Sequence, residues 1–258
     1  IIPTFNQGTY LKRCLTSIEN QTFKDFEIII IDKYSTDNTK IVVDEFSHLP
    51  IKFLQIENNG NIANSRNYGI KNSTGNVIAF LDSDDIWTND KLDSCYRKII
   101  EGHDIIFHNL KIIGNSKNYF KKILKGRVLK HPILRDLLVK GNPIFNSSVM
   151  VKKNILEQVN LINENKKMIA SEDYNLWLKI SNVTKKFYYI NQNLGSYQLN
   201  HNGISKRKNM SYSTLFASRE FFSLLSHNEK NLARSRIFYI GGKFFFQKKN
   251  IIFVKKNY

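Results

Sequence analysis

Apolar residues in the first hundred positions form short continuous runs separated by segments with helical spacing. Residues 77–81 are an unbroken apolar run, which suits a strand buried on both faces of a parallel sheet. Residues 28–31 form a β-branched run, and residues 51–56 and 103–110 predict two further strands. Helices are expected before and between these strands, over residues 10–18, 62–70 and 91–100. This alternation predicts an α/β fold with a doubly wound, mostly parallel sheet and flanking helices.

The second half of the chain is less regular. Residues 144–151 and 187–190 predict two more strands, and Ser171 opens an expected helix as its N-cap. From residue 206 onward the pattern becomes helical, amphipathic and basic. We therefore expect one unit over residues 1–205, followed by a basic, aromatic-rich helical region over residues 206–258.

Composition narrows the class of protein. The 258 residues carry a formal net charge of +17, and no apolar run reaches the length of about 20 residues needed to span a membrane. Cys14 and Cys95 are far apart, so neither a disulfide framework nor a zinc site is indicated, which fits a reducing, cytoplasmic compartment. The chain opens at Ile1 without Met and inside an expected strand, so we expect the N-terminus to be incomplete.

The positive charge is concentrated in the C-terminal region. Lys and Arg recur there among Phe, Tyr and Ile, with Glu220 and Glu229 as the acids. A basic helix with aromatic residues suits an anionic membrane surface. Packing of the same aromatic residues against the preceding unit explains the pattern equally well, and a basic nucleic-acid-binding module is a further alternative.

The largest local concentration of candidate functional side chains is the acidic segment 82–85, which follows the apolar run 77–81. Ligands of open α/β sheets bind outside the carboxyl ends of the strands. Asp82, Asp84 and Asp85 repel one another unless a cation or hydrogen bonds compensate, so the segment predicts a divalent metal beside phosphate. An acidic turn that caps the next helix is the alternative.

Several segments in one order resemble glycosyltransferase family 2, the inverting enzymes with the GT-A fold. The resemblance covers approximately residues 1–205 and implies a catalytic domain there. Its segments are IIPTFN (1–6), QTF (21–23), Asp32 with STDNT (35–39), SRNYG (65–69), FLDSDD (80–85) and EDYNLWL (172–178).

The resemblance implies that the nucleotide lies against Pro3, Thr4 and Phe5, with Phe5 beside the base. Strand-end packing of Phe5 is the alternative. Asp32 and Lys33 stand where the family usually has two acids, the second of which accepts a hydrogen bond from uracil. Lysine has donors only. Lys33 could donate to a ring carbonyl or to phosphate, or point to solvent while Asp32 acts alone.

The remaining nucleotide and metal positions follow from the same resemblance. Arg66 is expected to approach the nucleotide phosphates, with a surface salt bridge as the alternative. Asp84 is expected to hold Mn²⁺ or Mg²⁺, Asp82 to contact the ribose or the same ion, and Asp85 to cap the following helix.

Asp173 is the expected general base, and Glu172 is expected to contact the acceptor or support the loop. Both residues could instead be acids that stabilise the start of a helix. His201 could reach the metal or the diphosphate, or be a surface loop residue. Gln198 and Asn200 stand where the family commonly has Arg and His.

The resemblance therefore implies a metal-dependent inverting glycosyltransferase with a nucleotide-diphosphate sugar, favouring a UDP-sugar, as donor. The expected acceptor is a glycan or a lipid-linked glycan in bacterial surface polysaccharide synthesis, at the inner face of the cell membrane. No nucleic acid is expected as a partner. A catalytically inactive GT-A scaffold is the alternative, because Lys33, Gln198 and Asn200 depart from the family pattern.

Overall fold

The chain folds around two sheets that meet at the first strand. A computed structural model describes residues 1–114, 122–199 and 210–249. The first sheet is parallel, in the order β1 (Ile2–Thr4), β2 (Ile28–Asp32) and β3 (Ile51–Gln55). Ile1 exchanges backbone hydrogen bonds with Ala79 and Leu81, so β4 (Val77–Ala79) continues this surface into the second sheet.

The second sheet is mixed, whereas a mostly parallel sheet was expected. It has the order β4, β8, β6, β9 and β5, and β7 pairs with β6 outside this path. β6 and β9 are parallel, but the pairs of β4 with β8, β6 with β8 and β5 with β9 are antiparallel. The strands are β5 (Ile86–Trp87), β6 (Ile105–Ile113), β7 (Ile123–Leu124), β8 (Met150–Lys152) and β9 (Phe187–Gln198).

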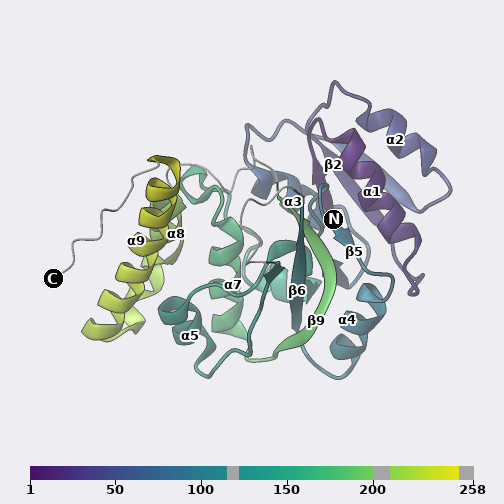
Figure 1. Ribbon diagram of the computed structural model, residues 1–258. Coiled ribbons are helices and arrows are strands. Elements are labelled where there is room, and N and C mark those ends of the chain that lie inside the picture. The colour runs from purple at the N-terminus through teal and green to yellow at the C-terminus, as the bar shows by residue number, and fades with distance from the viewer. Residues whose placement is uncertain (115–121, 200–209, 250–258) are drawn as a thin grey trace.

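Helices cover both faces of the sheets. The remaining elements are α1 (Gly8–Glu19), α2 (Thr39–Glu45), α3 (Ile62–Lys71), α4 (Lys91–Ile100), α5 (Ile133–Lys140), η1 (Asn146–Ser148), α6 (Lys153–Gln158), η2 (Lys166–Met168), α7 (Glu172–Val183), α8 (Met210–Ser218), η4 (Arg219–Leu224) and α9 (His227–Lys249). One apolar cluster joins α1, α2 and α4 to the sheets, and another lies under α3, α5, α6 and α7. The fold is thus a layered α/β arrangement (Figure 1).

The sequence pattern explains most of these elements. The side chains of β2 are buried throughout, as expected for a parallel strand covered on both faces. In α1, Leu11, Cys14, Leu15 and Ile18 are buried at helical spacing. The expected strand at 144–151 is wrong in its first half, because residues 146–148 form the 3₁₀ turn η1 before β8 begins.

The C-terminal helices share the core of the preceding unit. Ala217, Phe222, Leu225 and Ile237 are buried in the same apolar cluster as α5 and α7. Figure 1 shows α8 and α9 at the end of the molecule opposite α1 and α2. Core packing therefore accounts for part of the aromatic pattern expected in this region. No helix in the described ranges combines the length and apolar content needed to cross a membrane.

Candidate active site

The acidic segment 82–85 follows β4 at the carboxyl edge of the sheet. The backbone N–H of Asp82 donates to Ser147 Oγ over 3.1 Å, and Asn146 Nδ2 donates to Asp82 Oδ1 over 3.1 Å. These contacts come from η1, whose residues lie in the segment between α5 and β8. η1 therefore fixes both the backbone and the carboxylate of Asp82.

Arg66 joins this segment to the start of α7. Its guanidinium donates to Asp82 Oδ1 over 2.7 Å and to Glu172 Oε1 over 2.8 Å. The Arg66 side chain is only 4% exposed. Burial opposes the charged form, but Asp82 and Glu172 raise the pKa of Arg66 above its ordinary value, so the guanidinium stays charged.

The helix that carries Arg66 is held on two sides. Gly69 packs so tightly that a Cβ there would lie 2.7 Å from side-chain atoms of Ile1 and Ile31, so α3 sits close against β1 and β2. Asn67 Nδ2 donates to Ile162 O over 2.8 Å, and Asn67 Oδ1 accepts from Ile162 N over 3.0 Å. These contacts anchor α3 to the segment that leads toward α7.

Asp173 has the ionisation expected of a general base. Burial and the neighbouring charge of Glu172 raise the pKa of Asp173 to about 7, although Arg66 and a hydrogen bond from Tyr174 N oppose the rise. The preceding Ala170 adopts a left-handed conformation with φ of 71°. Such backbone strain in a non-glycine residue is concentrated at functional sites.

Ser171 stands at the N-cap position of α7 but forms no capping bond. Its hydroxyl shares a hydrogen bond of 3.0 Å with Thr214 Oγ1 on α8. Glu172 is buried and its Oε2 has no hydrogen-bond partner among the described residues. Glu172 is paired with Arg66, and Asp173 is buried beside it. Capping of a helix alone would require neither the ion pair nor the burial.

Asp85 does not cap α4, contrary to the expectation. It is followed by β5, and its Oδ1 accepts a hydrogen bond of 2.9 Å from Gln198 N at the end of β9. The carboxyl is buried, which together with Asp82 and Asp84 raises the pKa of Asp85 well above its usual range. Asp85 thus ties the acidic segment to the last residue of β9.

The metal-ligating prediction falls on two partly exposed carboxylates. Asp82 has an exposed side-chain fraction of 29%, and Asp84 is also partly exposed. Within the described ranges, no three carboxylate, imidazole or thiol side chains converge into a metal cage. One or two carboxylates that complete their coordination with substrate phosphates are the usual arrangement for Mg²⁺. The oxygen donors present fit such an ion.

The expected nucleotide residues differ in accessibility. Pro3, Thr4 and Asp32 are buried, and Asp32 accepts hydrogen bonds from Ser35 N over 2.9 Å and from Gln55 Nε2 over 3.0 Å. Phe5 is 48% exposed at the end of β1. Phe5 therefore presents a surface to a ligand, whereas Asp32 is engaged within the protein.

The predicted roles of Arg66 and His201 remain predictions. Arg66 is buried and paired with the partly exposed Asp82 and the buried Glu172 rather than lying at the surface, so its contact with phosphate stays a prediction. His201 lies outside the described residues. Asn146 and Ser147, which hold Asp82, are not among the site residues expected from the sequence. Nothing local in the sequence identifies them, because both contacts span more than sixty residues.

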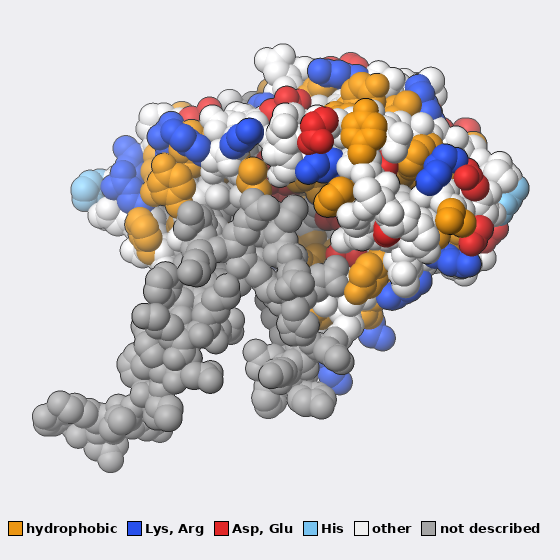
Figure 2. All heavy atoms as spheres, turned by 90° about the horizontal axis from the view of Figure 1, so that it is seen from above, with side chains coloured by type: hydrophobic (Ala, Val, Ile, Leu, Met, Phe, Trp, Pro, Cys, Tyr) orange, Lys and Arg blue, Asp and Glu red, His pale blue; other side chains and the backbone are white. Residues whose placement is uncertain are grey.

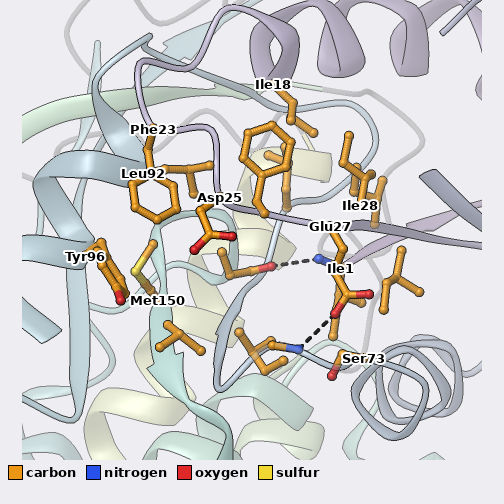
Figure 3. Close-up of a pocket in the computed structure, with 18 of the residues that line it drawn as sticks. Ile1, Ile18, Phe23, Asp25, Glu27, Ile28, Ser73, Leu92, Tyr96 and Met150 are labelled. Atoms are coloured by element: carbon orange, nitrogen blue, oxygen red, sulfur yellow. Dashed lines mark hydrogen bonds between the residues drawn. The ribbon is translucent and has the colours of Figure 1, made fainter. Parts of the chain in front are cut away.

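A separate cavity of about 510 Å³ lies at the opposite edge of the sheet. It is lined by the starts of β1, β2 and β4 and by Leu92, Tyr96 and Met150, as Figure 3 shows. Asp25 and Glu27 lie at this cavity, and Glu27 Oε1 accepts a hydrogen bond of 2.6 Å from Thr74 N. Because Asp82, Arg66 and Asp173 do not line it, the cavity is separate from the site around Asp82.

Comparison with known proteins agrees with this geometry. The family model described as Glycosyl transferase family 2 matches residues 1–159. An Escherichia coli protein, UDP-Glc:alpha-D-GlcNAc-diphosphoundecaprenol beta-1,3-glucosyltransferase WfgD, is 31% identical over 181 residues, covering 70% of this chain and 68% of that protein. Glycosyltransferase GlyA of Streptococcus pneumoniae is 28% identical over 222 residues, which cover 80% of this chain but only 31% of that relative.

Two solved structures share the fold. Staphylococcus aureus TarS 1–349 in complex with UDP-GlcNAc superposes with a TM-score of 0.71 at 21% identity, covering 97% of this chain and 75% of that one. The mannosyltransferase PcManGT from Pyrobaculum calidifontis, in complex with GDP-Man and Mn²⁺, gives a TM-score of 0.66 at 15% identity and covers 98% and 75% of the two chains. Together with the family match over most of the α/β unit, these findings lead to one conclusion: the chain belongs to glycosyltransferase family 2.

Proposed function

We propose that this glycosyltransferase moves a sugar from a nucleotide-diphosphate donor to a glycan or lipid-linked acceptor with inversion at the anomeric carbon. The observation that carries the proposal is the chain Asp82–Arg66–Glu172, which brings the acidic segment next to Asp173. A carboxylate whose pKa is about 7 suits a general base near neutral pH.

Asp173 would take the proton from the acceptor hydroxyl as that oxygen attacks the anomeric carbon. Burial and then Glu172 raise the pKa of Asp173 and therefore its basicity, and Arg66 limits the rise. No protein nucleophile is required for a single in-line displacement.

Asp84 and Asp82 would hold Mn²⁺ or Mg²⁺. When bound, the ion supplies positive charge that stabilises the departing diphosphate. Asn146 and Arg66 fix Asp82 Oδ1 by hydrogen bonds of 3.1 and 2.7 Å, so this carboxylate needs little reorganisation to bind. The Mn²⁺ in the PcManGT complex supports the choice of metal.

A UDP-sugar is the favoured donor, and surface polysaccharide synthesis the favoured role. Support comes from the UDP-glucose and the diphosphoundecaprenol acceptor in the name of WfgD, and from the UDP-GlcNAc complex of TarS. A lipid-linked acceptor would place the enzyme at the cytoplasmic face of the membrane. Figure 2 shows basic and hydrophobic side chains side by side at the end that carries the C-terminal helices, which suits an anionic lipid surface.

The test is a transfer assay with UDP-sugars and a lipid-diphosphate sugar acceptor, with and without Mn²⁺. Release of UDP and the anomeric proton coupling of the product are measured by NMR. We expect metal-dependent transfer with inversion, and a loss of about a hundredfold or more in Asp84→Asn. Retention of configuration, or full activity of Asp84→Asn, would reject this mechanism. Failure of wild-type protein to bind or transfer from any donor would favour an inactive scaffold.

A further inference from the structure

Three neighbouring strands deliver three side chains to one small surface. Phe5 follows β1, Lys33 follows β2 and Glu57 lies just beyond β3. Lys33 N donates to Thr4 O and Ile56 N donates to Asp32 O, each over 3.0 Å, so the sheet bonding continues past the strand ends. The three side chains therefore project from a fixed edge of the parallel sheet.

The loops behind these residues are tightly turned and linked to one another. Asn6, Tyr34 and Asn59 all have positive φ, with values of 50°, 51° and 51°. Asn6 N donates to Ser35 Oγ over 2.8 Å, and Asn6 Oδ1 accepts from Thr36 N over 2.8 Å. The loops after β1 and β2 are thus joined by two hydrogen bonds.

Lys33 lies between the aromatic ring and the carboxylate. Its ammonium is 4.9 Å from the centroid of the Phe5 ring and 3.8 Å from Glu57 Oε1. Glu57 Oε1 also accepts a hydrogen bond of 2.8 Å from Asn59 N, which orients the carboxylate. A hydrogen-bond donor and an acceptor therefore stand side by side next to an exposed aromatic face.

We propose that Lys33 and Glu57 together select the base of the donor nucleotide. Lys33 would donate to a ring carbonyl and Glu57 would accept from the adjacent ring N–H, while Phe5 packs against the base. Uracil and guanine carry this neighbouring carbonyl and N–H. Cytosine and adenine present the reverse, an amino donor beside an unprotonated ring nitrogen. The inference rests on the proposed use of a nucleotide donor.

This pairing explains how the chain tolerates lysine at position 33. A lysine cannot accept the hydrogen bond that an acid at this position would accept. Glu57, on the next strand of the sheet, supplies an acceptor 3.8 Å from the ammonium. Because the Glu57 side chain is 58% exposed, the ion pair adds little to folding stability, and its removal should leave the fold intact.

The test measures dissociation constants of UDP, GDP, CDP and ADP by calorimetry in the presence of Mn²⁺. We expect wild-type protein to bind UDP or GDP at least about tenfold more tightly than CDP and ADP. Lys33→Met and Glu57→Gln should each remove most of this preference while leaving the CDP and ADP constants within about twofold. The variants Lys12→Met and Glu45→Gln break another exposed ion pair, of 2.7 Å, and serve as matched controls that should retain the preference.

The outcomes separate this inference from the proposed function. Comparable binding of all four nucleotides, a preference for CDP or ADP, or an unchanged preference in both variants would overturn base selection while leaving the donor site in place. The absence of binding by any nucleotide with metal would reject the donor site itself. The ratio of UDP to GDP affinity then identifies which of the two bases the site takes.

Discussion

At the scale of single residues, Asp173 is the proposed general base and its carboxyl is in a buried environment that disfavours the charged form. Replacing it with asparagine removes the proton acceptor while keeping the shape of the side chain. We expect Asp173→Asn to lower the rate of transfer by about a hundred- to ten-thousandfold, the range that general base catalysis contributes. Steady-state kinetics would show this as a loss in kcat. Asp93→Asn, which also removes an acid from a first helical turn, is the matched control and should retain activity.

Asp173→Asn should lower the rate of transfer but raise the stability of the folded protein at pH 8. The pKa of Asp173 is raised in the folded protein, so the folded state binds its proton more tightly than the unfolded state between about pH 4 and pH 7. Stability contributed by this group is therefore present at low pH and lost as pH rises through 7. At pH 8, Asp173→Asn should melt at a higher temperature than wild type. A lower melting temperature would contradict the raised pKa.

The pH dependence of transfer should follow Asp173 and respond to Arg66. Because the base must be ionised, kcat/KM should rise with pH through an apparent pKa of about 7. Arg66 lowers the pKa of Asp173, so Arg66→Met should shift this rise to higher pH. If the residual activity of Arg66→Met rises at the same pH as that of wild type, the charge of Arg66 does not influence the pKa of Asp173.

Arg66 is also expected to be structurally important. Arg66→Met leaves Asp82 and the buried Glu172 without their partner, which costs about 3–5 kcal/mol of unfolding free energy for a buried pair. Arg97→Met breaks an exposed ion pair of 2.7 Å within α4 and should cost about 0.5 kcal/mol or less. Chemical denaturation of both variants distinguishes the contacts of Arg66 with Asp82 and Glu172, which we call the Arg66 clamp, from an ordinary surface pair.

At the scale of elements, α4 begins with an unusual buried lysine. Lys91 is fully buried, its ammonium lies 3.8 Å from the centroid of the Trp87 ring, and it has no hydrogen-bond partner among the described residues. Burial lowers the pKa of Lys91 to about 8. The unfolded chain binds this proton more tightly, so wild-type stability should increase as pH rises from about 8 toward 10.5.

Lys91→Met should therefore stabilise the protein at pH 7. We expect a gain of about 1–3 kcal/mol in unfolding free energy, which combines relief of the buried charge with loss of the attraction to Trp87. The gain should shrink as pH rises toward 10.5. A variant that is less stable than wild type at pH 7 would show that the contact with Trp87 outweighs the cost of burial.

The elements also show which features sequence reasoning can reach. A continuous apolar run identified β2 closely, because a strand buried on both faces leaves a strong local signal. The strand expected at 187–190 continues as β9 to Gln198. The prediction ended too early because residues 191–193 are exposed and polar and so resemble a loop. Local signals therefore locate buried elements better than exposed ones.

The site divides in a similar way. The acids that flank it could be predicted, because they stand at strand and helix ends. The Arg66–Glu172 contact spans 106 residues, and Asp85 reaches Gln198 across 113, so neither pairing has a local pattern. The link between Lys33 and Glu57 depends on two strands being neighbours in the sheet. These pairings required the three-dimensional fold.

At the scale of the whole molecule, the C-terminal helices are expected to contribute to stability. Phe222 is buried in the shared core, and Phe222→Ala should cost about 3–5 kcal/mol of unfolding free energy. Phe238 is 59% exposed on α9, and Phe238→Ala should change stability by about 0.5 kcal/mol or less. Equal effects of the two variants on the denaturation midpoint would contradict the packing of these helices.

The exposed aromatic residues of α9 provide the test of membrane association. Phe238 and Tyr239 are exposed and lie close to the exposed Arg234 along the helix, a combination that favours an anionic lipid surface. We expect the protein to co-sediment with vesicles containing phosphatidylglycerol, less so at high salt, and the double variant Phe238→Ala, Tyr239→Ala to bind several-fold more weakly. Replacement of exposed Ile41 by Ala on α2 is the control, and equal binding by all three proteins would reject this surface.

The long span of the Arg66 clamp also bears on how the chain is synthesised. Arg66 leaves the ribosome 106 residues before Glu172, which at ordinary rates of synthesis is a delay of about 5–20 s. Until then the guanidinium lacks one of its two carboxylate partners, and the N-terminal strands cannot complete the site. Nascent chains that end before α7 lack Glu172 and Asp173, and chains that end before Gln198 also lack the partner of Asp85, so we expect no activity until β9 has been synthesised.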